Sequence, residues 1–361
     1  MLNADCHNPF RTVRAAFTLV ELLVVITIMG VLTSIILFAL AGAQESAKAD
    51  KTRSTISKLN SLVMAKYESY RTRRVPVDLK LVAVYKGYMS AGQTTNTTQP
   101  LARTKVDVIR ELMRMEMPDR YSDITDNSVT AWTDPGTGAT VHMARPAVNQ
   151  AYLNAISGGP ITAYESAKCL YLLVSLGLDD PDVMAEFSED EIATDTRDHM
   201  RYFVDGWGQP IFFLRWAPGF SSPLQPSDVN AKDALNNPKS KVVFVTSHDP
   251  FDPLKAYIPT VASDPFYNPG ALATQQIHPP LYPLIYSAGP DRIFDIFVNT
   301  KPDFQYSTTD PPNDPYTAPP GGLFGAPTDQ DSDFTPSGVT TGDGVDNSID
   351  NITNHDLSVT Q

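Results

Sequence analysis

Residues 17–43 decide the fold, and they read FTLVELLVVITIMGVLTSIILFALAGA, a stretch in which Glu21 is the only charged side chain. As a helix, this stretch would extend about 40 Å at 1.5 Å per residue. That length is enough to cross a hydrocarbon layer of roughly 30 Å. Arg11 and Arg14 precede the stretch, and basic residues beside a membrane span favour the cytoplasmic side. The sequence therefore predicts a single membrane-spanning helix with the following residues outside the cytoplasm.

Glu21 is the unusual residue of this stretch. A carboxylate near the start of a lipid-facing helix costs several kcal/mol unless it finds a partner or is neutralised, and such residues are candidates for a function. An ordinary single-pass anchor that happens to carry a glutamate is the alternative interpretation.

The helical pattern continues beyond residue 43. Apolar side chains recur at three- and four-residue steps on one face, while lysine and arginine fill the other; the apolar positions are Ile56, Leu59, Val63, Tyr67 and Tyr70. Pro76 ends the pattern after a basic cluster at 71–74. The sequence thus predicts one helix from Phe17 to about Tyr70, with residues 17–43 in the membrane and residues 44–75 packed on a head.

Residues 16–21, Ala-Phe-Thr-Leu-Val-Glu, closely resemble the processing site of type IV pilins and type II secretion pseudopilins. The resemblance implies that prepilin peptidase removes a leader of residues 1–16 by cutting between Ala16 and Phe17, and that the new N-terminus is methylated. It also implies that Glu21 pairs with the N-terminal amine of a neighbouring subunit. The implied partners are prepilin peptidase, other pilin-like subunits and the inner membrane, with the head outside the cytoplasm and later in an envelope filament.

Two positions depart from the family pattern. Ala16 stands where the family usually has glycine, and Phe38 stands where it commonly has a proline that kinks the helix. The second departure implies that the helix need not melt near residue 38.

The remaining chain predicts an α+β head with two regions. Residues 76–203 are expected to be a mostly helical insertion, with helices over 106–115 and 163–176. Residues 204–298 contain short apolar runs between turns, which predict a small antiparallel sheet; its expected strands are 211–216, 242–246, 284–286 and 293–298.

Two loops of the sheet region carry a more specific resemblance. Asp205-Gly-Trp-Gly-Gln-Pro210 resembles the turn that opens the sheet of type II major pseudopilins, and Tyr286-Ser-Ala-Gly-Pro-Asp291 resembles a later loop of the same fold. Their order favours a pseudopilin over a generic pilin.

Residues 299–361 form a loop rich in proline and glycine, followed by an acidic tail. Asp343, Asp346 and Asp350 bring carboxylates onto glycine-containing turns, and such hard oxygen donors are the ligands that calcium prefers. The resemblance to major pseudopilins, which bind calcium near the C-terminus, brings Asp291 to the same place. A calcium site at these four residues and a merely solvated acidic tail are both consistent with the sequence.

Composition argues against several other functions. The formal net charge of −13 provides no basic surface for a phosphate backbone, so nucleic acid is not an expected partner. A membrane-anchored exported enzyme or binding protein is the alternative from another class. The histidines beyond residue 16 have no metal-binding spacing, and no nucleophile or phosphate-loop motif occurs. We therefore expect a structural filament subunit rather than an enzyme.

Overall fold

The computed structural model describes residues 19–74, 98–126, 131–133, 140–142, 144–156, 159, 161, 163–178, 180, 182–220, 222–225, 227–228, 242–243, 248–255, 278–294, 296 and 350–357. The chain divides into two compact units, residues 1–47 and residues 48–361. We call the second unit the head.

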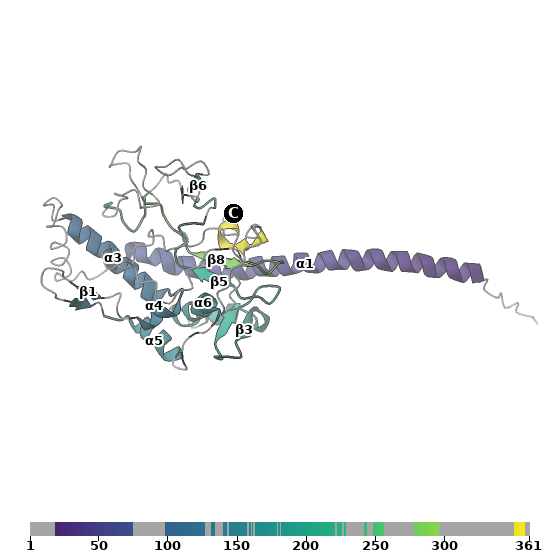
Figure 1. Ribbon diagram of the computed structural model, residues 1–361, viewed down its shortest axis with the longest axis horizontal. Helices are drawn as coiled ribbons and strands as arrows, with labels where there is room; N and C mark the ends of the chain where they lie inside the picture. Colours follow the sequence, from purple (N-terminus) through teal and green to yellow (C-terminus); the bar gives the residue numbers. More distant parts are fainter. Residues whose placement is uncertain are drawn as a thin grey trace, which may run out of the picture. The chain divides into compact units, whose positions relative to one another are not determined.

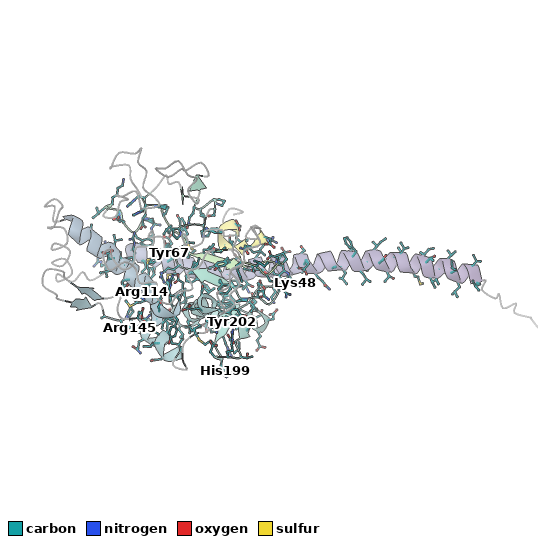
Figure 2. All side chains as sticks on the ribbon, viewed as in Figure 1. Lys48, Tyr67, Arg114, Arg145, His199 and Tyr202 are labelled. Carbon is teal, nitrogen blue, oxygen red and sulfur yellow. The ribbon has the colours of Figure 1, made fainter. Side chains whose placement is uncertain are left out.

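Helix α1 (Leu19–Thr72) is one uninterrupted helix and confirms the predicted long N-terminal helix. Every side chain from Leu19 to Ala47 is exposed. From Lys48 onward the helix belongs to the head (Figures 1 and 2). There it buries one stripe of side chains: Thr52, Thr55, Ile56, Leu59, Val63, Tyr67 and Tyr70. The spacing of this stripe is that of an amphipathic helix lying on a core.

Four further helices of the described part of the head lie in the region expected to be helical. They are α3 (Thr98–Glu116), α4 (Tyr121–Thr125), α5 (Ala147–Ala155) and α6 (Glu165–Leu176), followed by the 3-10 turns η2 (Val183–Glu186) and η3 (Glu189–Glu191). The first predicted helix is therefore longer than 106–115. The second begins only at Glu165, because the preceding Tyr164 has a left-handed φ of 52°. Figure 1 shows α6 next to β5, with α4 and α5 in the same part of the head.

A three-stranded antiparallel sheet forms the centre of the head. Its order is β5 (Phe212–Leu214), β8 (Leu284–Ser287) and β9 (Ile352–Thr353), with Phe212 opposite Tyr286 and Ser287 opposite Ile352. Three antiparallel pairs accompany the sheet: β1 (Ala131–Thr133) with β2 (Thr140–His142), β3 (Ile192–Thr194) with β4 (Arg201–Phe203), and β6 (Ser227–Asp228) with β7 (Val242–Val243). The short helix α7 (Asn354–Leu357) follows β9. The α+β prediction is confirmed.

Two of the expected strands differ from the structure, and one strand of the sheet was not expected. The run at 242–246 contributes β7, which pairs with β6 instead of joining β5 and β8. Ile293 and Phe294 are in no strand, because Arg292 has a φ of 69° and the carboxylate of Asp291 accepts the backbone N–H of Ile293, so the chain turns there. The third strand of the sheet comes instead from the polar tail, as β9.

The main hydrophobic core joins α1 to these elements. Leu59 and Val63 of α1 pack in one buried cluster with Leu173 of α6, Phe213 of β5 and Ile285 of β8. Helix α6 also contacts β4 and β5. Because fully burying an aliphatic or aromatic side chain of this size contributes about 1.5–3 kcal/mol, this cluster is what holds the head-side part of α1.

A polar contact also fixes α1, nearer to Lys48. The buried carboxylate of Glu191 accepts hydrogen bonds from Thr55 Oγ1 at 2.5 Å and Lys58 Nζ at 3.1 Å, both on α1. The same carboxylate closes a capping box with Ser188 at the start of η3. Glu191 thereby joins the η3 turn to the helix.

A second polar feature of the head is a buried ion cluster, which consists of Glu111, Arg114, Asp119, Asp123 and Arg215. Asp123 Oδ2 accepts from Arg215 Nη1 at 2.8 Å, and its Oδ1 lies 3.4 Å from Arg114 Nη1. Burial would raise the pKa of Asp123, but the attraction of the two guanidinium groups outweighs it, so this pKa is lowered. The cluster connects α3 and α4 to the end of β5.

Candidate functional site

The first candidate site is the exposed part of α1. Leu19 is 79% exposed and Phe38 is 85% exposed, and the apolar side chains between them are exposed as well. Within the described part of the chain, α1 is the one helix that is long and apolar enough to cross a membrane. A helix with apolar side chains all around needs a lipid or protein cover.

The polar groups within this part of α1 are arranged for an apolar environment. The hydroxyls of Thr27, Thr33 and Ser34 donate hydrogen bonds to backbone carbonyls one turn earlier, at 2.8 Å in each case. Such internal bonds remove the cost of placing a hydroxyl in hydrocarbon. Glu21, in the first turn, is the one ionisable group between Leu19 and Ala43. The lipid or protein that surrounds this part of α1 must therefore accommodate one charge, the carboxylate of Glu21.

The second candidate site is the C-terminal corner, which we define as residues 289–291 together with Asp350 and Asn351. Gly289 has a φ of 71°, and a Cβ there would lie 2.5 Å from the backbone oxygen of Asp350. Only glycine therefore allows this loop to approach the tail so closely. Burial and repulsion from Asp291 both raise the pKa of Asp350.

The C-terminal corner contains oxygen atoms whose bonding capacity is unused. Among the described residues, Asp350 Oδ1 and Asn351 Oδ1 are buried and have no hydrogen-bond partner. Asn351 is 8% exposed, and its Nδ2 donates to the backbone oxygen of Phe294. A buried acceptor without a donor costs free energy, and a hard cation would satisfy both oxygens. Carboxylate and amide oxygens of this kind are the ligands that calcium prefers in proteins.

The comparison with family models concerns the first site. Residues 11–37 match the prokaryotic N-terminal methylation motif. The chain carries a type IV pilin-like N-terminus. The motif implies processing by prepilin peptidase and assembly with other pilin subunits, and the apolar helix beside it is consistent with a membrane-anchored, single-pass protein. The motif also indicates a structural role rather than an enzymatic one. No curated protein and no solved structure matches the chain.

The structure describes only one of the three residues predicted to act in processing and assembly at the N-terminus. Glu21 lies on α1 with its side chain exposed. Ala16 and Phe17 lie outside the described residues, so the cleavage site stays a prediction of the sequence and of the matched motif.

Two of the four predicted calcium ligands lie within the described residues. Asp291 and Asp350 come close enough for their charges to interact. Asp343 and Asp346 lie outside the described residues. No group of three or more histidine, cysteine, aspartate or glutamate side chains that could hold a metal occurs within the part of the chain that the structure describes. The four-residue site therefore stays a prediction.

Sequence reasoning missed the roles of two residues in the head. Asn351 contributes a buried amide oxygen to the C-terminal corner, a role that its place in the acidic tail does not indicate. Asp205 is recognisable from the sequence only as the start of a turn, but its carboxylate also accepts a hydrogen bond from Ser287 Oγ at 2.6 Å. Asp205 lies in loop 205–210 and Ser287 lies in loop 286–291. Both loops resemble loops of major pseudopilins, so this resemblance was the signal in the sequence for their contact.

Proposed function

We propose that the protein is a structural subunit of a type II secretion pseudopilus. In this proposal the exposed parts of α1 from many copies bundle in the filament core, and the heads cover the outside. The work of the subunit is mechanical, since assembly extends the filament from the membrane. No catalytic step is required of the chain.

The main support for the proposal is the apolar stretch of α1. This stretch is fully exposed, overlaps the matched methylation motif and has Glu21 in its first turn. Each large apolar side chain that stays in water forgoes about 1.5–3 kcal/mol of burial free energy. The lipid bilayer covers these side chains before assembly, and helices of neighbouring subunits cover them afterwards. In the filament a cation on a neighbouring chain compensates the charge of Glu21, and the methylated amine of Phe17 is such a cation.

A pseudopilus is favoured over an adhesive or DNA-binding pilus by the head. The hydrogen bond from Ser287 to Asp205 brings together the two loops that resemble those of major pseudopilins. The net charge of −13 gives no general attraction for DNA.

Removing the subunit from its source organism tests this distinction. Deletion of its gene is expected to lower the amount of secreted enzymes in the culture medium, while these enzymes accumulate inside the envelope. Surface adhesion and DNA uptake should stay at the wild-type level. A strain that keeps secreting normally but loses adhesion or DNA uptake would assign the subunit to a pilus instead. Complementation with the intact gene is the control.

The C-terminal corner is the proposed calcium site. Asp291, Asp350 and the amide oxygen of Asn351 would hold the ion, together with Asp343 and Asp346 from the tail. A bound calcium ion would neutralise the repulsion between Asp291 and Asp350 and give the two orphaned oxygens a partner. Magnesium should substitute poorly, because it demands compact octahedral geometry and dehydrates reluctantly.

Calcium is expected to raise the thermal midpoint of the full chain in detergent. An ion that binds only the folded head at 100 times its dissociation constant stabilises it by about 2.7 kcal/mol. A variant with Asp343→Ala, Asp346→Ala and Asp350→Ala should lose this response. Asp182→Ala, which removes an exposed carboxylate elsewhere in the head, should keep it. An equal calcium response in the triple variant would show that the tail is only a solvated acidic segment.

Without calcium, the stability of the head should depend on pH, because the pKa of Asp350 is raised in the folded state. A carboxyl group whose pKa is higher in the folded state binds its proton more tightly there. Its favourable contribution to folding is therefore present at acidic pH and is lost as the pH rises through the folded-state pKa. With chelator, the stability that depends on Asp350 should fall on going from acidic to neutral pH, and calcium should remove this loss.

A further inference from the structure

A segment near the end of the chain completes the central sheet of the head. We call residues 352–357, which form β9 and α7, the C-terminal strap. β9 pairs with β8, and Figure 1 shows the yellow strap beside β8. Ile352 belongs to the main hydrophobic core, and Leu357 packs against that core. The strap therefore provides the third strand of the sheet and a part of the core that also contains α1.

Asn354 joins the strap to two other elements. Its Oδ1 accepts the N–H of Ile285 in β8 at 2.8 Å. Its Nδ2 donates to the backbone oxygen of Pro283 at 3.0 Å and to Asn60 Oδ1 of α1 at 2.8 Å. The side chain is buried, so both ends of its amide are satisfied within the protein. Asn354 thus holds the strap to β8 and to the head-side part of α1.

The next residue, His355, is fully buried, and its hydrogen bonds define one neutral tautomer. Its Nε2 lies 3.1 Å from the backbone oxygen of Pro283, which can only accept, so Nε2 carries the hydrogen. The lone pair of Nδ1 then accepts the hydroxyl of Ser222 at 2.8 Å. The oxygen of that hydroxyl accepts the backbone N–H of Gln225 at 3.1 Å. A neutral imidazole therefore connects the strap to the segment around Ser222.

A proton added to Nδ1 would break this connection. Nδ1 would become a donor, so the hydroxyl of Ser222 would have to turn its hydrogen toward another acceptor. The ring would also carry a positive charge beside the apolar ring of Phe220, whose centroid is 5.3 Å away. A buried charge costs free energy unless it is paired. The closed strap therefore requires a neutral His355.

The groups around the ring do little to favour its charged form. The two segments that hold the ring, 217–225 and 281–285, contain no charged side chain, and Tyr282 is their one titratable residue. The nearby carboxylate is that of Asp356, which is exposed on α7 itself. Burial lowers the pKa of His355 to about 4, although the bond to the Pro283 carbonyl and the charge of Asp356 act in the opposite direction.

We propose that His355 is an acid-sensitive lock, which keeps the C-terminal strap on β8 and α1 at neutral pH and releases it in acid. Protonation separates α7 from the segment around Ser222. The strap then leaves with Asn354, and β8 loses its third strand while α1 loses the contact at Asn60. An acidic environment thereby opens the head of the subunit at one edge of its sheet. The inference is independent of the calcium site and of the filament function.

The direction of the pH dependence follows from the neutral ring of the closed strap. Release exposes His355 to water, where its pKa returns to about 6.5. The released form therefore binds a proton more readily than the closed form. The closed strap keeps its full stability above about pH 6.5 and loses it as the pH falls toward about 4. Between pH 7 and pH 5, the equilibrium constant for release should rise by roughly 20-fold.

Hydrogen exchange of the full chain in detergent, measured by mass spectrometry at pH 7 and pH 5, tests the proposal after correction for the intrinsic pH dependence of exchange. In the wild type, the protection of residues 352–357 should fall by roughly 20-fold, while that of α6 changes little. His355→Gln keeps an N–H for the Pro283 carbonyl and does not titrate, so it should not show this fall. Both proteins contain Asp350, so the titration of that carboxyl group cancels in the comparison.

His199→Asn is the matched control, because His199 is an exposed histidine with a φ of 58°, a conformation that asparagine tolerates. It should keep the full response to acid. Should His355→Gln fail to fold, Ser222→Ala serves instead, since it removes the hydroxyl that distinguishes the neutral ring from the charged one. Its strap should be less protected at pH 7 and should lose less protection at pH 5 than the wild type.

Two results would overturn the lock. One is a wild-type strap that is equally protected at pH 7 and pH 5. The other is an equal loss of protection in the wild type and in His355→Gln, or in Ser222→Ala where that variant is used, because a different group would then open the strap. A response that disappears in His199→Asn would likewise assign the acid sensitivity to the exposed histidine and not to His355.

Discussion

Glu21→Ala is expected to insert into the membrane and fold its head normally, yet to enter filaments far less than the wild type. Removal of the charge makes the apolar helix easier to insert, so the loss must arise at assembly. Breaking a desolvated ion pair costs about 3–5 kcal/mol, because the remaining charge is left without compensation. That cost corresponds to a decrease of roughly two to four orders of magnitude in the association constant of the subunits.

Filament yield, measured by shearing and by electron microscopy, checks this expectation. Glu68→Ala is the matched control, since Glu68 is a glutamate of the same helix that pairs with the exposed Arg71 in the head. It should assemble like the wild type. Equal filament yields for Glu21→Ala and Glu68→Ala would show that the carboxylate in the first turn has no role in assembly.

Asp123→Ala should cause the largest loss of stability in the head. The substitution leaves Arg114 and Arg215 buried without their shared carboxylate, and such a change costs about 3–5 kcal/mol. The lowered pKa of Asp123 adds a pH dependence. Its stabilising contribution is present above the ordinary carboxyl pKa and is lost as the pH falls toward the lowered value, so acid should destabilise the wild type more than the variant.

Thermal or denaturant unfolding of the full chain in detergent, followed by circular dichroism, measures this loss. Asp182→Ala removes an exposed aspartate and should change the free energy of unfolding by no more than about 0.5 kcal/mol. If both variants unfold like the wild type at neutral pH, the buried ion cluster does not hold α3, α4 and β5 together.

The long helix could be predicted from the sequence because its signals are strong and local. An apolar run of 27 residues and a stripe at three- and four-residue steps each require a helix, and no proline interrupts them before Pro76. The short strands β5 and β8 were recognisable for a similar reason, since Phe212–Leu214 and Leu284–Ser287 lie in apolar runs bounded by turns.

The strand β9 could not be recognised in the same way. Ile352 and Thr353 lie within a tail of aspartate and asparagine, and two residues carry no periodic pattern. Their strand conformation comes from pairing with Tyr286 and Ser287, which is a tertiary contact. Local β-propensity is a weak predictor of a strand that forms only because it pairs with the edge of β8.

The buried ion cluster was missed because a charged residue on an amphipathic helix normally indicates the solvated face. Glu111 and Arg114 of α3 are both buried, and their partners Asp123 and Arg215 come from α4 and from the end of β5. Sequence spacing shows the i, i+3 pair of Glu111 and Arg114, but it cannot show that other elements cover this pair.

The C-terminal corner was partly accessible from the sequence. The resemblance to major pseudopilins places Asp291 and Asp350 in one candidate site on sequence grounds alone. The role of Asn351 was not accessible, because a buried and unpartnered amide oxygen is a property of packing and not of composition.

Mass spectrometry of the mature N-terminus shows whether the chain is processed as a pilin-like subunit. The chain would be produced with and without an active prepilin peptidase and isolated from the membrane. With the peptidase, we expect a protein that begins at Phe17 with a methylated amine, while the chain made without it keeps residues 1–16. A membrane-embedded protein that retains residues 1–16 in the presence of the active peptidase would show that α1 is an ordinary membrane anchor and not the assembly helix of a filament.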